Sequence, residues 1–279
     1  MSLRRFEGRN VLVTGASRGI GASLARRLAA EGANLFLVAR HLDPHDKVPG
    51  SLRETVALCE ALGAKAHAHS ADLADQNSRL GIIPAALEHF KGHIDVVLNN
   101  AAAAMYGPLL DYPGKRLRLT YEVNTFAPLE ICQQVLPSMI TRGEGWIVNV
   151  SSATAKHNEG PPFRKTHTSH GIYGSSKAAL NRITNDLAVE MYEHGVRINT
   201  IEPRAAVMSE GAQILVGDFV RKDQIESMEE MVEATLALCC CDKDSTGAVH
   251  VSLDLIDQWG LTVHDLDAKG PWTPQPELT

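Results

Sequence analysis

The chain has 279 residues, of which 44% are hydrophobic and 22% are charged. This balance is typical of a folded globular protein and excludes disordered and collagen-like chains. The formal net charge of −6 gives no overall basic surface, so neither a nucleic acid nor an anionic membrane is expected as a partner.

Expected strands and helices alternate along the chain. A short apolar run over 10–14 ends in a glycine-rich loop, and a helical pattern follows over 19–31, closed by Gly32. The further expected strands are 34–39, 65–70, 94–99, 146–151, 196–201 and 248–253, and the further expected helices are 52–62, 77–90, 114–142, 172–193 and 228–241.

This alternation determines the predicted fold class. Strands that alternate with helices of ten or more residues imply right-handed crossovers and a parallel sheet that is covered on both faces. The length alone allows one α/β domain or two domains, but no linker-like stretch separates two halves. We therefore predict a single Rossmann-type doubly wound α/β domain with a seven-stranded parallel sheet and helices on both faces.

The cysteines and the first ten residues indicate the cellular compartment of the protein. Five cysteines form no CxxC pair, and their odd number argues against a disulfide framework. The first ten residues are polar and charged, unlike a signal peptide, and no run of about 18 apolar residues follows. We expect a cytoplasmic protein.

A glycine-rich loop, TGASRGIG, occupies residues 14–21 between the first expected strand and helix. Glycines allow a tight turn and let the backbone approach a pyrophosphate, while the helix start offers free N–H groups. A purely structural turn is the alternative, but the strand–loop–helix context favours dinucleotide binding. The expected contacts are Gly15, Ser17, Arg18, Ile20 and Gly21.

Arg40 lies at the end of the second expected strand, where an acidic residue would bind a ribose 2′-hydroxyl. Arg18 and Arg40 could instead pair with a 2′-phosphate. Each of them alone could be a solvated surface charge, but together they predict NADP(H) rather than NAD as the cofactor.

Further motifs follow in a fixed order: Asp72-Leu73, Asn99-Asn100-Ala101-Ala102, Asn124, Ser151-Ser152, and Tyr173-Gly174-Ser175-Ser176-Lys177. With the glycine loop, they resemble the short-chain dehydrogenase/reductase family over about residues 8–253. The resemblance implies an oxidoreductase that moves a hydride between NADP(H) and a carbonyl or secondary alcohol.

The resemblance also assigns four catalytic residues. Tyr173 is the expected general acid or base. Lys177 lies one helical turn away, and its charge and that of the nicotinamide are both expected to lower the pKa of Tyr173. Lys177 should also hydrogen-bond the nicotinamide ribose. Ser152 polarises the substrate oxygen, and Asn124 holds a water that links Lys177 to solvent. Without the resemblance, each of these residues could have an ordinary structural role.

The remaining cofactor contacts are carried over from the same motifs. Asp72 and Leu73 should approach the adenine, Asn100 and Ala101 the adenine ribose, and Pro203 and Val207 the nicotinamide. Tyr173 and Lys177 complete the expected cofactor-binding set.

The chain departs from the family pattern at three places. Ala102 replaces the usual glycine, and Arg204 replaces the glycine of the usual Pro-Gly. We expect Arg204 to pair with Glu202, although contact with an acidic substrate is the alternative. An insert at 156–171 separates Ser152 from Tyr173 and is expected to shape the pocket rim.

Two further groups of residues, histidines and cysteines, are expected to have structural roles. His157, His167 and His170 lack matching ligands and predict no metal site. The cysteines at 239–241 are expected to fill apolar space. The C-terminal extension, 264–279, could be flexible or could pack on another subunit.

Two further classes of function remain open beside the oxidoreductase: a cofactor-binding scaffold or sensor with little catalysis, and a lyase or epimerase on the same fold. The expected substrate is a small-molecule carbonyl or alcohol whose identity the sequence does not give. The resemblance also implies a homotetramer or homodimer that uses the helices near 114–142 and 172–193.

Overall fold

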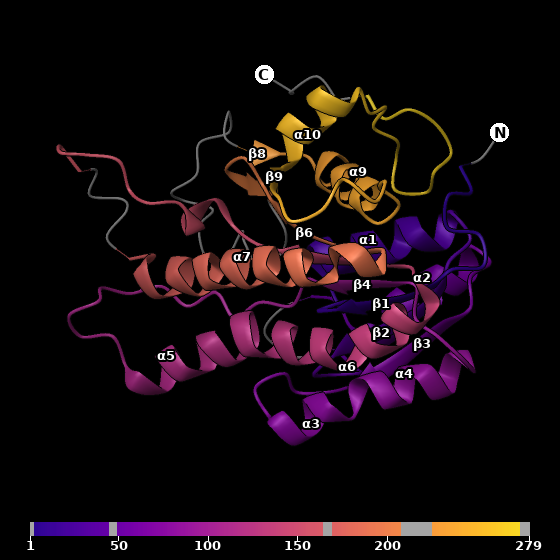
Figure 1. The fold of residues 1–279 in the computed structure, drawn as a ribbon, viewed down its shortest axis with the longest axis horizontal. Helices are drawn as coiled ribbons and strands as arrows, with labels where there is room; N and C mark the ends of the chain where they lie inside the picture. The colour runs from indigo at the N-terminus through magenta and orange to yellow at the C-terminus, as the bar shows by residue number, and fades with distance from the viewer. Residues whose placement is uncertain (1–2, 45–48, 164–168, 208–224, 274–279) are drawn as a thin grey trace.

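The computed structural model describes residues 3–44, 49–163, 169–207 and 225–273. A parallel sheet of seven strands runs through its centre in the order β3-β2-β1-β4-β5-β6-β9 (Figure 1). The strands are β1 (Asn10–Thr14), β2 (Asn34–Ala39), β3 (Ala66–Ser70), β4 (Val96–Asn99), β5 (Gly145–Val150), β6 (Val196–Glu202) and β9 (Val249–Val251). The predicted sheet is therefore confirmed.

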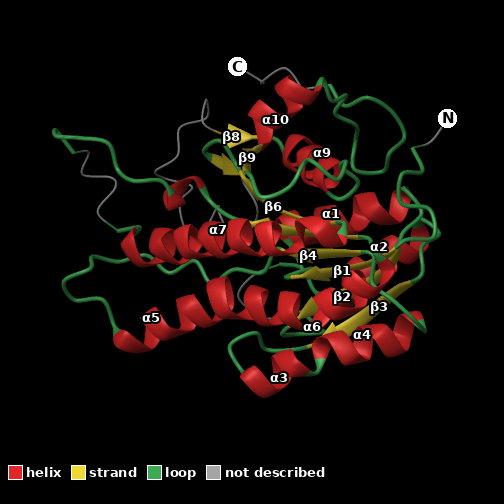
Figure 2. Cartoon of the chain, in the orientation of Figure 1, coloured by secondary structure: helices red, strands yellow, loops and turns green. Residues whose placement is uncertain are grey.

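Helices cover both faces of the sheet (Figure 2). One face carries α1 (Gly19–Ala30), α2 (Leu52–Ala61), α9 (Met228–Leu238) and α10 (Ser252–Trp259), and the other carries α4 (Ile82–Phe90), α6 (Ala127–Arg142) and α7 (Gly171–Met191). The short helix α3 (Gln76–Leu80) precedes α4, and α5 (Gly114–Tyr121) precedes α6. This arrangement is the predicted doubly wound, Rossmann-type fold.

The apolar runs of the strands explain why both faces are covered. Val11 and Val13 of β1 enter the cluster beneath α1, whereas Leu12, between them, enters the cluster beneath α4 and α6. In β2, Leu35 enters the cluster beneath α1 and Phe36 enters the cluster beneath α4 and α6. Successive side chains on a strand point to opposite faces, so a continuous apolar run needs helices on both sides.

Several predicted bounds shift by one to three residues, and three predicted elements are divided, interrupted or partly replaced by another element. The expected helix 77–90 is divided at Gly81, which ends α3 and precedes α4. The expected helix 114–142 contains a π-helical turn, η1 (Glu122–Phe126). The strand expected through residue 253 ends at Val251, because the next residue begins α10, whose Leu255 packs into the core.

Two short segments complete the described fold. The pair β7 (Ala206–Val207) and β8 (Ile225–Glu226) forms a small parallel sheet that the sequence did not predict. Beyond α10, the chain turns back onto α1, where Arg27 donates to the carbonyl oxygens of His264 and Asp265 at 3.1 Å. The described part of the C-terminal extension thus packs on its own chain. Over the described ranges, no helix combines the length and apolar character needed to cross a bilayer.

Candidate active site

Ser152 lies at the carboxyl end of β5, where polar residues of parallel strands gather. It is the N-cap of a single 3-10 turn, η2 (Ala153–Ala155), and its Oγ accepts a hydrogen bond from the Thr154 amide at 3.2 Å. The same oxygen lies 2.9 Å from Thr154 Oγ1. Ser152 therefore has the capping role that a serine after a strand commonly has, in addition to facing the site.

Tyr173 and Lys177 lie one turn apart near the N-terminus of α7, and both are buried. Burial raises the pKa of Tyr173, Tyr106 raises it further, and a hydrogen bond with Ser152 lowers it in part. Burial also lowers the pKa of Lys177 to about 7, and the Lys177 Nζ donates to the Val150 carbonyl at 2.7 Å.

The expected lowering of the Tyr173 pKa by Lys177 and the nicotinamide charge stays a prediction. Among the described residues, burial and Tyr106 favour the phenol form of Tyr173, and the hydrogen bond with Ser152 opposes them in part. The Lys177 amine donates to the Val150 carbonyl, and burial disfavours its charged form.

Asn124 lies in the π-helical turn η1 and is fully buried. Its side-chain oxygen accepts from the Ala103 amide at 2.7 Å, and its Nδ2 donates to the Ala103 carbonyl at 3.2 Å and to Ser176 Oγ at 3.0 Å. The amide therefore links the loop after β4 to α7, beside Lys177. A water at this position stays a prediction.

The glycine loop packs tightly against the loop that follows β4. A Cβ on Gly21 would lie 2.3 Å from the Gly15 carbonyl oxygen and 2.4 Å from Asn100 Nδ2, so no larger residue fits there without movement. Gly15 has φ +68°, which only glycine adopts readily. Both glycines thus have a packing reason as well as the predicted cofactor role.

The N-terminus of α1 meets the requirements of a phosphate site. The N-cap residue is Arg18, whose side chain has no acceptor and so cannot cap the first amides, and the first turn carries no acidic residue. The backbone N–H groups at a helix start and the positive end of the helix dipole favour an anion. The residues present therefore fit a dinucleotide pyrophosphate.

Arg40 is exposed at the carboxyl end of β2, and its carbonyl accepts from Ser70 Oγ at 2.8 Å. It lines a small cavity of about 350 Å³ together with His41, Leu42, Asp43, Pro44 and Ser70. Arg18 lies at the neighbouring loop and donates to the Gly50 carbonyl at 3.3 Å. The Ala16 amide donates to the Val38 carbonyl at 3.2 Å, so the loop that carries Arg18 adjoins the strand that Arg40 follows.

The other expected cofactor residues lie at the same edge of the sheet. Asp72 is exposed and Leu73 is buried after β3, while Asn100 and Ala101 are half-buried after β4. Pro203 is half-buried after β6, and Val207 is buried in β7. Ser17 and Ile20 are half-buried in the glycine loop.

Thr14 is a site residue that the sequence reasoning missed. Its Oγ1 accepts from the amides of Asn100 and Ala101, both at 3.1 Å, while Asn100 Nδ2 donates to the Thr14 carbonyl at 3.0 Å. These bonds join the two loops that approach the expected cofactor. A hydroxyl residue directly before the glycine loop was the available signal.

The expected pairing of Arg204 with Glu202 is wrong. The Arg204 guanidinium lies 2.6 Å from Asp254 Oδ1, on α10, while Glu202 lies 2.9 Å from Lys156 Nζ. Glu202 is fully buried, and burial raises its pKa. Glu202 is the buried last residue of β6, whereas Arg204 lies beyond the end of the strand and is exposed, so the two side chains have different surroundings.

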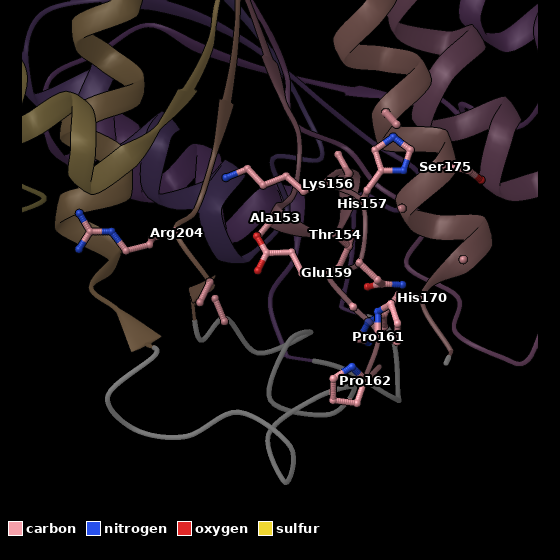
Figure 3. A pocket seen from close by; sticks show the side chains of 18 residues that line it. Ala153, Thr154, Lys156, His157, Glu159, Pro161, Pro162, His170, Ser175 and Arg204 are labelled. Atoms are coloured by element: carbon pink, nitrogen blue, oxygen red, sulfur yellow. The ribbon is translucent and has the colours of Figure 1, made fainter. Parts of the chain in front are cut away.

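A cavity of about 1010 Å³ is lined by the chain neighbours of Ser152 and Tyr173, Ala153 and Gly174 among them. Figure 3 shows Arg204 on one side of it, His157 and Ser175 on the other, and His170 close to Pro161. Ser152, Tyr173 and Lys177 do not themselves line it. The lining residues are 153–162 together with His170, Gly171, Gly174, Ser175, Ala178, Arg204, Ala205 and Ala206.

The histidine-rich insert lies only partly within the described residues. His157 and His170 line the cavity, whereas His167 falls outside the described residues. In the part of the chain that the structure describes, no group of three His, Cys, Asp or Glu side chains is arranged to hold a metal ion.

A doubly wound sheet that carries a serine, a tyrosine and a lysine at its carboxyl edge defines the class of dinucleotide-dependent oxidoreductases. The chain belongs to the short-chain dehydrogenase family, whose profile matches residues 9–237.

Individual relatives agree with this assignment. Hydroxysteroid dehydrogenase-like protein 2 of Danio rerio is 30% identical over 97% of this chain, which spans only 63% of that protein's length. A short-chain dehydrogenase from Mycobacterium thermoresistibile has a TM-score of 0.79 at 27% identity, covering 91% of this chain and 88% of that one. A metagenomic short-chain oxidoreductase, solved in complex with NADP, has a TM-score of 0.71 at 25% identity, covering 88% of this chain and 97% of that one.

Proposed function

We propose that the protein is an NADP(H)-dependent oxidoreductase that interconverts a carbonyl compound and a secondary alcohol. The observation that carries this proposal is the meeting of Ser152, Tyr173 and Lys177 at the carboxyl edge of the sheet, with a hydrogen bond between the Ser152 and Tyr173 side chains. Such a bond places a polarising hydroxyl beside a proton donor, as reduction of a carbonyl requires.

The chain's own residues perform the acid–base part of the reaction. Tyr173, which burial keeps protonated, gives its proton to the carbonyl oxygen. Ser152 donates a hydrogen bond to the same oxygen as negative charge develops on it. Lys177 lies one turn away and stabilises the phenolate that remains. Bound NADPH supplies the hydride for the carbonyl carbon.

The preference for NADP(H) is supported by Arg40, whose exposed guanidinium forms no ion pair with the described residues. Arg18 lies on the adjoining loop, so the two cations could bind a 2′-phosphate. The similar oxidoreductase solved with NADP points the same way. The pyrophosphate would lie at the N-terminus of α1, and Tyr173 and Lys177 would contact the nicotinamide ribose.

The alternative function is a cofactor-binding scaffold or sensor with little catalysis, which the unusual Arg204 first suggested. The pairing of Arg204 with Asp254 weakens this alternative, because it gives the cation a partner outside the catalytic set. Lyase or epimerase chemistry remains a third option on this fold.

The test is a panel of ketones, aldehydes and secondary alcohols, including hydroxysteroids because of the relative's name. Oxidation or reduction of the nicotinamide is followed by its absorbance with each cofactor. We expect turnover with at least one compound and a preference for NADPH over NADH. No turnover with any compound, combined with tight cofactor binding, would favour the sensor.

We further propose that the chain forms a homodimer or homotetramer through α5 and α7. Leu117 and Phe126 of the α5–η1 segment and Val189 of α7 are exposed, and contact between these helices and those of a second copy would bury them. Sedimentation that shows only a monomer at micromolar concentration would contradict this proposal.

A further inference from the structure

Tyr106 lies in the loop between β4 and α5, and its ring contacts the ring of Tyr173. The two ring centroids are 5.6 Å apart, and the rings meet edge to face at 80°. Tyr106 also meets His170, the residue just before α7, at 4.9 Å and 72°. Three rings from two loops and a helix therefore meet around the proposed proton donor.

The loop that carries Tyr106 is fixed at both ends of this contact. Before Tyr106, Ala103 exchanges two backbone hydrogen bonds with the Asn124 side chain. After Tyr106, the Gly107 amide donates to the Ser169 carbonyl at 2.9 Å. Neither bond uses the tyrosine itself, so the backbone would hold this position in a variant at residue 106.

The loop also closes onto α7. A Cβ on Gly171 would lie 2.8 Å from the Leu109 side chain, so Leu109 packs directly over the first residue of the helix. Tyr112 donates its hydroxyl proton to the Met105 carbonyl at 2.9 Å, which draws the loop together next to Tyr106. These two contacts hold the loop near the start of α7, although Leu109 and Leu110 themselves are largely exposed.

An edge-to-face contact restricts how a ring can turn and where its hydroxyl points. The Tyr173 hydroxyl is held by a hydrogen bond with Ser152. The contact with Tyr106 is a second constraint on the orientation of the Tyr173 ring. Proton transfer is sensitive to such placement, since a displacement of about 1 Å can cost roughly a hundredfold in rate. The hydroxyl of Tyr106 is half-buried and stays protonated because burial raises its pKa.

We propose that Tyr106 is a positioning residue for Tyr173, holding the catalytic ring through edge-to-face packing, and that His170 links this position to the insert at 156–171. The proposal rests on the proposed function, because Tyr173 is assigned as the proton donor there. Tyr106 itself needs no contact with the substrate or the cofactor.

The test uses NMR of protein labelled at tyrosine Cζ, without substrate. The chain has five tyrosines, so the Tyr173 resonance is identified by its loss in Tyr173→Phe. We expect Tyr106→Leu to shift that resonance and Tyr106→Phe, which keeps the ring, to leave it nearly unchanged. The control Tyr192→Phe removes a hydroxyl that bonds Asp244 far along the chain, and it should leave the Tyr173 resonance in place.

Turnover provides the second readout. Tyr106→Leu should lower kcat roughly tenfold with little change in KM for either substrate or cofactor, whereas Tyr106→Phe should stay within about twofold of the parent. An unmoved Tyr173 resonance in Tyr106→Leu would overturn the proposal. So would a raised substrate KM with an unchanged kcat, because that pattern marks a substrate contact.

The two proposals fail in different ways. Full activity of Tyr173→Phe would contradict the proposed function. The ring contact could still be tested in that case, because the Tyr173 resonance of Tyr106→Leu is measured without turnover. An intact proposed function with an unmoved resonance would instead remove only the role of Tyr106.

Discussion

Two ionisable side chains that the chemistry requires are buried, and burial favours the neutral form of both. The pKa of Tyr173 is raised, and that of Lys177 is lowered to about 7. A phenol that keeps its proton at neutral pH is suited to give it up only when negative charge develops beside it. The protonation state that burial gives Tyr173 thus suits the role of acid that we propose for it.

Arg40 is the residue on which the cofactor preference most depends. We predict that Arg40→Ala weakens NADPH binding by roughly ten- to a hundredfold and leaves NADH binding within about twofold, because only NADPH carries the 2′-phosphate. Fluorescence of the reduced nicotinamide gives both affinities. The control Arg182→Ala changes an exposed arginine that pairs with Asp186 on α7, and equal losses for both cofactors in Arg40→Ala would contradict the assignment.

Glu226 makes the stability of the fold depend on pH. Burial raises its pKa to about 7 from 4.5, so between these values the folded chain keeps a proton that the unfolded chain loses. The stability contribution of Glu226 is therefore complete below about pH 4.5 and is lost as the pH rises through about 7.

We accordingly predict that Glu226→Gln stabilises the protein at about pH 8, by up to about 3 kcal/mol, and changes its stability little near pH 4. The amide can still accept the hydrogen bond that Ser252 donates to this carboxylate. Thermal unfolding at both pH values measures the effect, with Glu190→Gln on the exposed side of α7 as the control. A gain that is equal at the two pH values would show that titration of Glu226 is not the cause.

At the scale of elements, the sequence was sufficient to predict a strand or helix wherever hydrophobic periodicity and a known motif agreed. The runs at 10–14 and 34–39 are strands with the predicted bounds, because each is an apolar run that continues into a glycine or a charged residue. The order of the motifs also predicted which ends of the strands carry the site. These features depend on local sequence, which is why they could be read without a structure.

Other features depend on contacts between distant segments. The π-helical turn at Asn124 interrupts a continuous helical pattern, and only the bonds to Ala103 and Ser176 show why that residue lies there. Arg204 pairs with Asp254 on α10, a helix that the sequence did not predict. Tyr106 gave no signal, since a tyrosine in a loop reaches Tyr173 only through packing of the whole loop.

The π-helical turn offers a test of how the site is held together. Asn124→Ala removes three hydrogen bonds and leaves the Ala103 amide and carbonyl without these partners, so we predict a loss of about 3 kcal/mol in unfolding free energy together with reduced kcat. Chemical denaturation measures the first and steady-state kinetics the second. The exposed Asn77 of α3 gives a matched control, Asn77→Ala, which should cost less than about 0.5 kcal/mol. A similar small loss for both variants would contradict the role assigned to Asn124.

At the scale of the whole molecule, a buried ionic network joins segments that are far apart in sequence. Arg27 of α1 lies 2.8 Å from Glu31 and 2.7 Å from Glu233 of α9, and it also donates to the carbonyls of His264 and Asp265. Arg5, near the N-terminus, pairs with the same two glutamates. The network thus connects α1, α9 and both terminal segments in the described residues.

Adjacent arginines allow this network to be tested with a close control. Arg27 is fully buried, whereas the Arg26 side chain is 34% exposed and pairs with Asp267. We predict that Arg27→Ala costs about 3–5 kcal/mol of unfolding free energy, because two buried carboxylates each lose their fully buried arginine partner and keep Arg5 as their other arginine. Arg26→Ala should cost less than about 1 kcal/mol. Equal losses in chemical denaturation would show that burial of the network is not what stabilises these contacts.

The central claim is that hydride moves between NADPH and a carbonyl carbon while Tyr173 supplies the proton. The most direct measurement uses NADPH carrying deuterium at the transferred position of nicotinamide C4, with the best carbonyl compound from the panel, and mass spectrometry of the alcohol. We predict one deuterium on the carbinol carbon with the parent protein, and a rate at saturating NADPH that is lowered by at least about a hundredfold in Tyr173→Phe. Alcohol formed without deuterium, or at an undiminished rate in Tyr173→Phe, would contradict the claim.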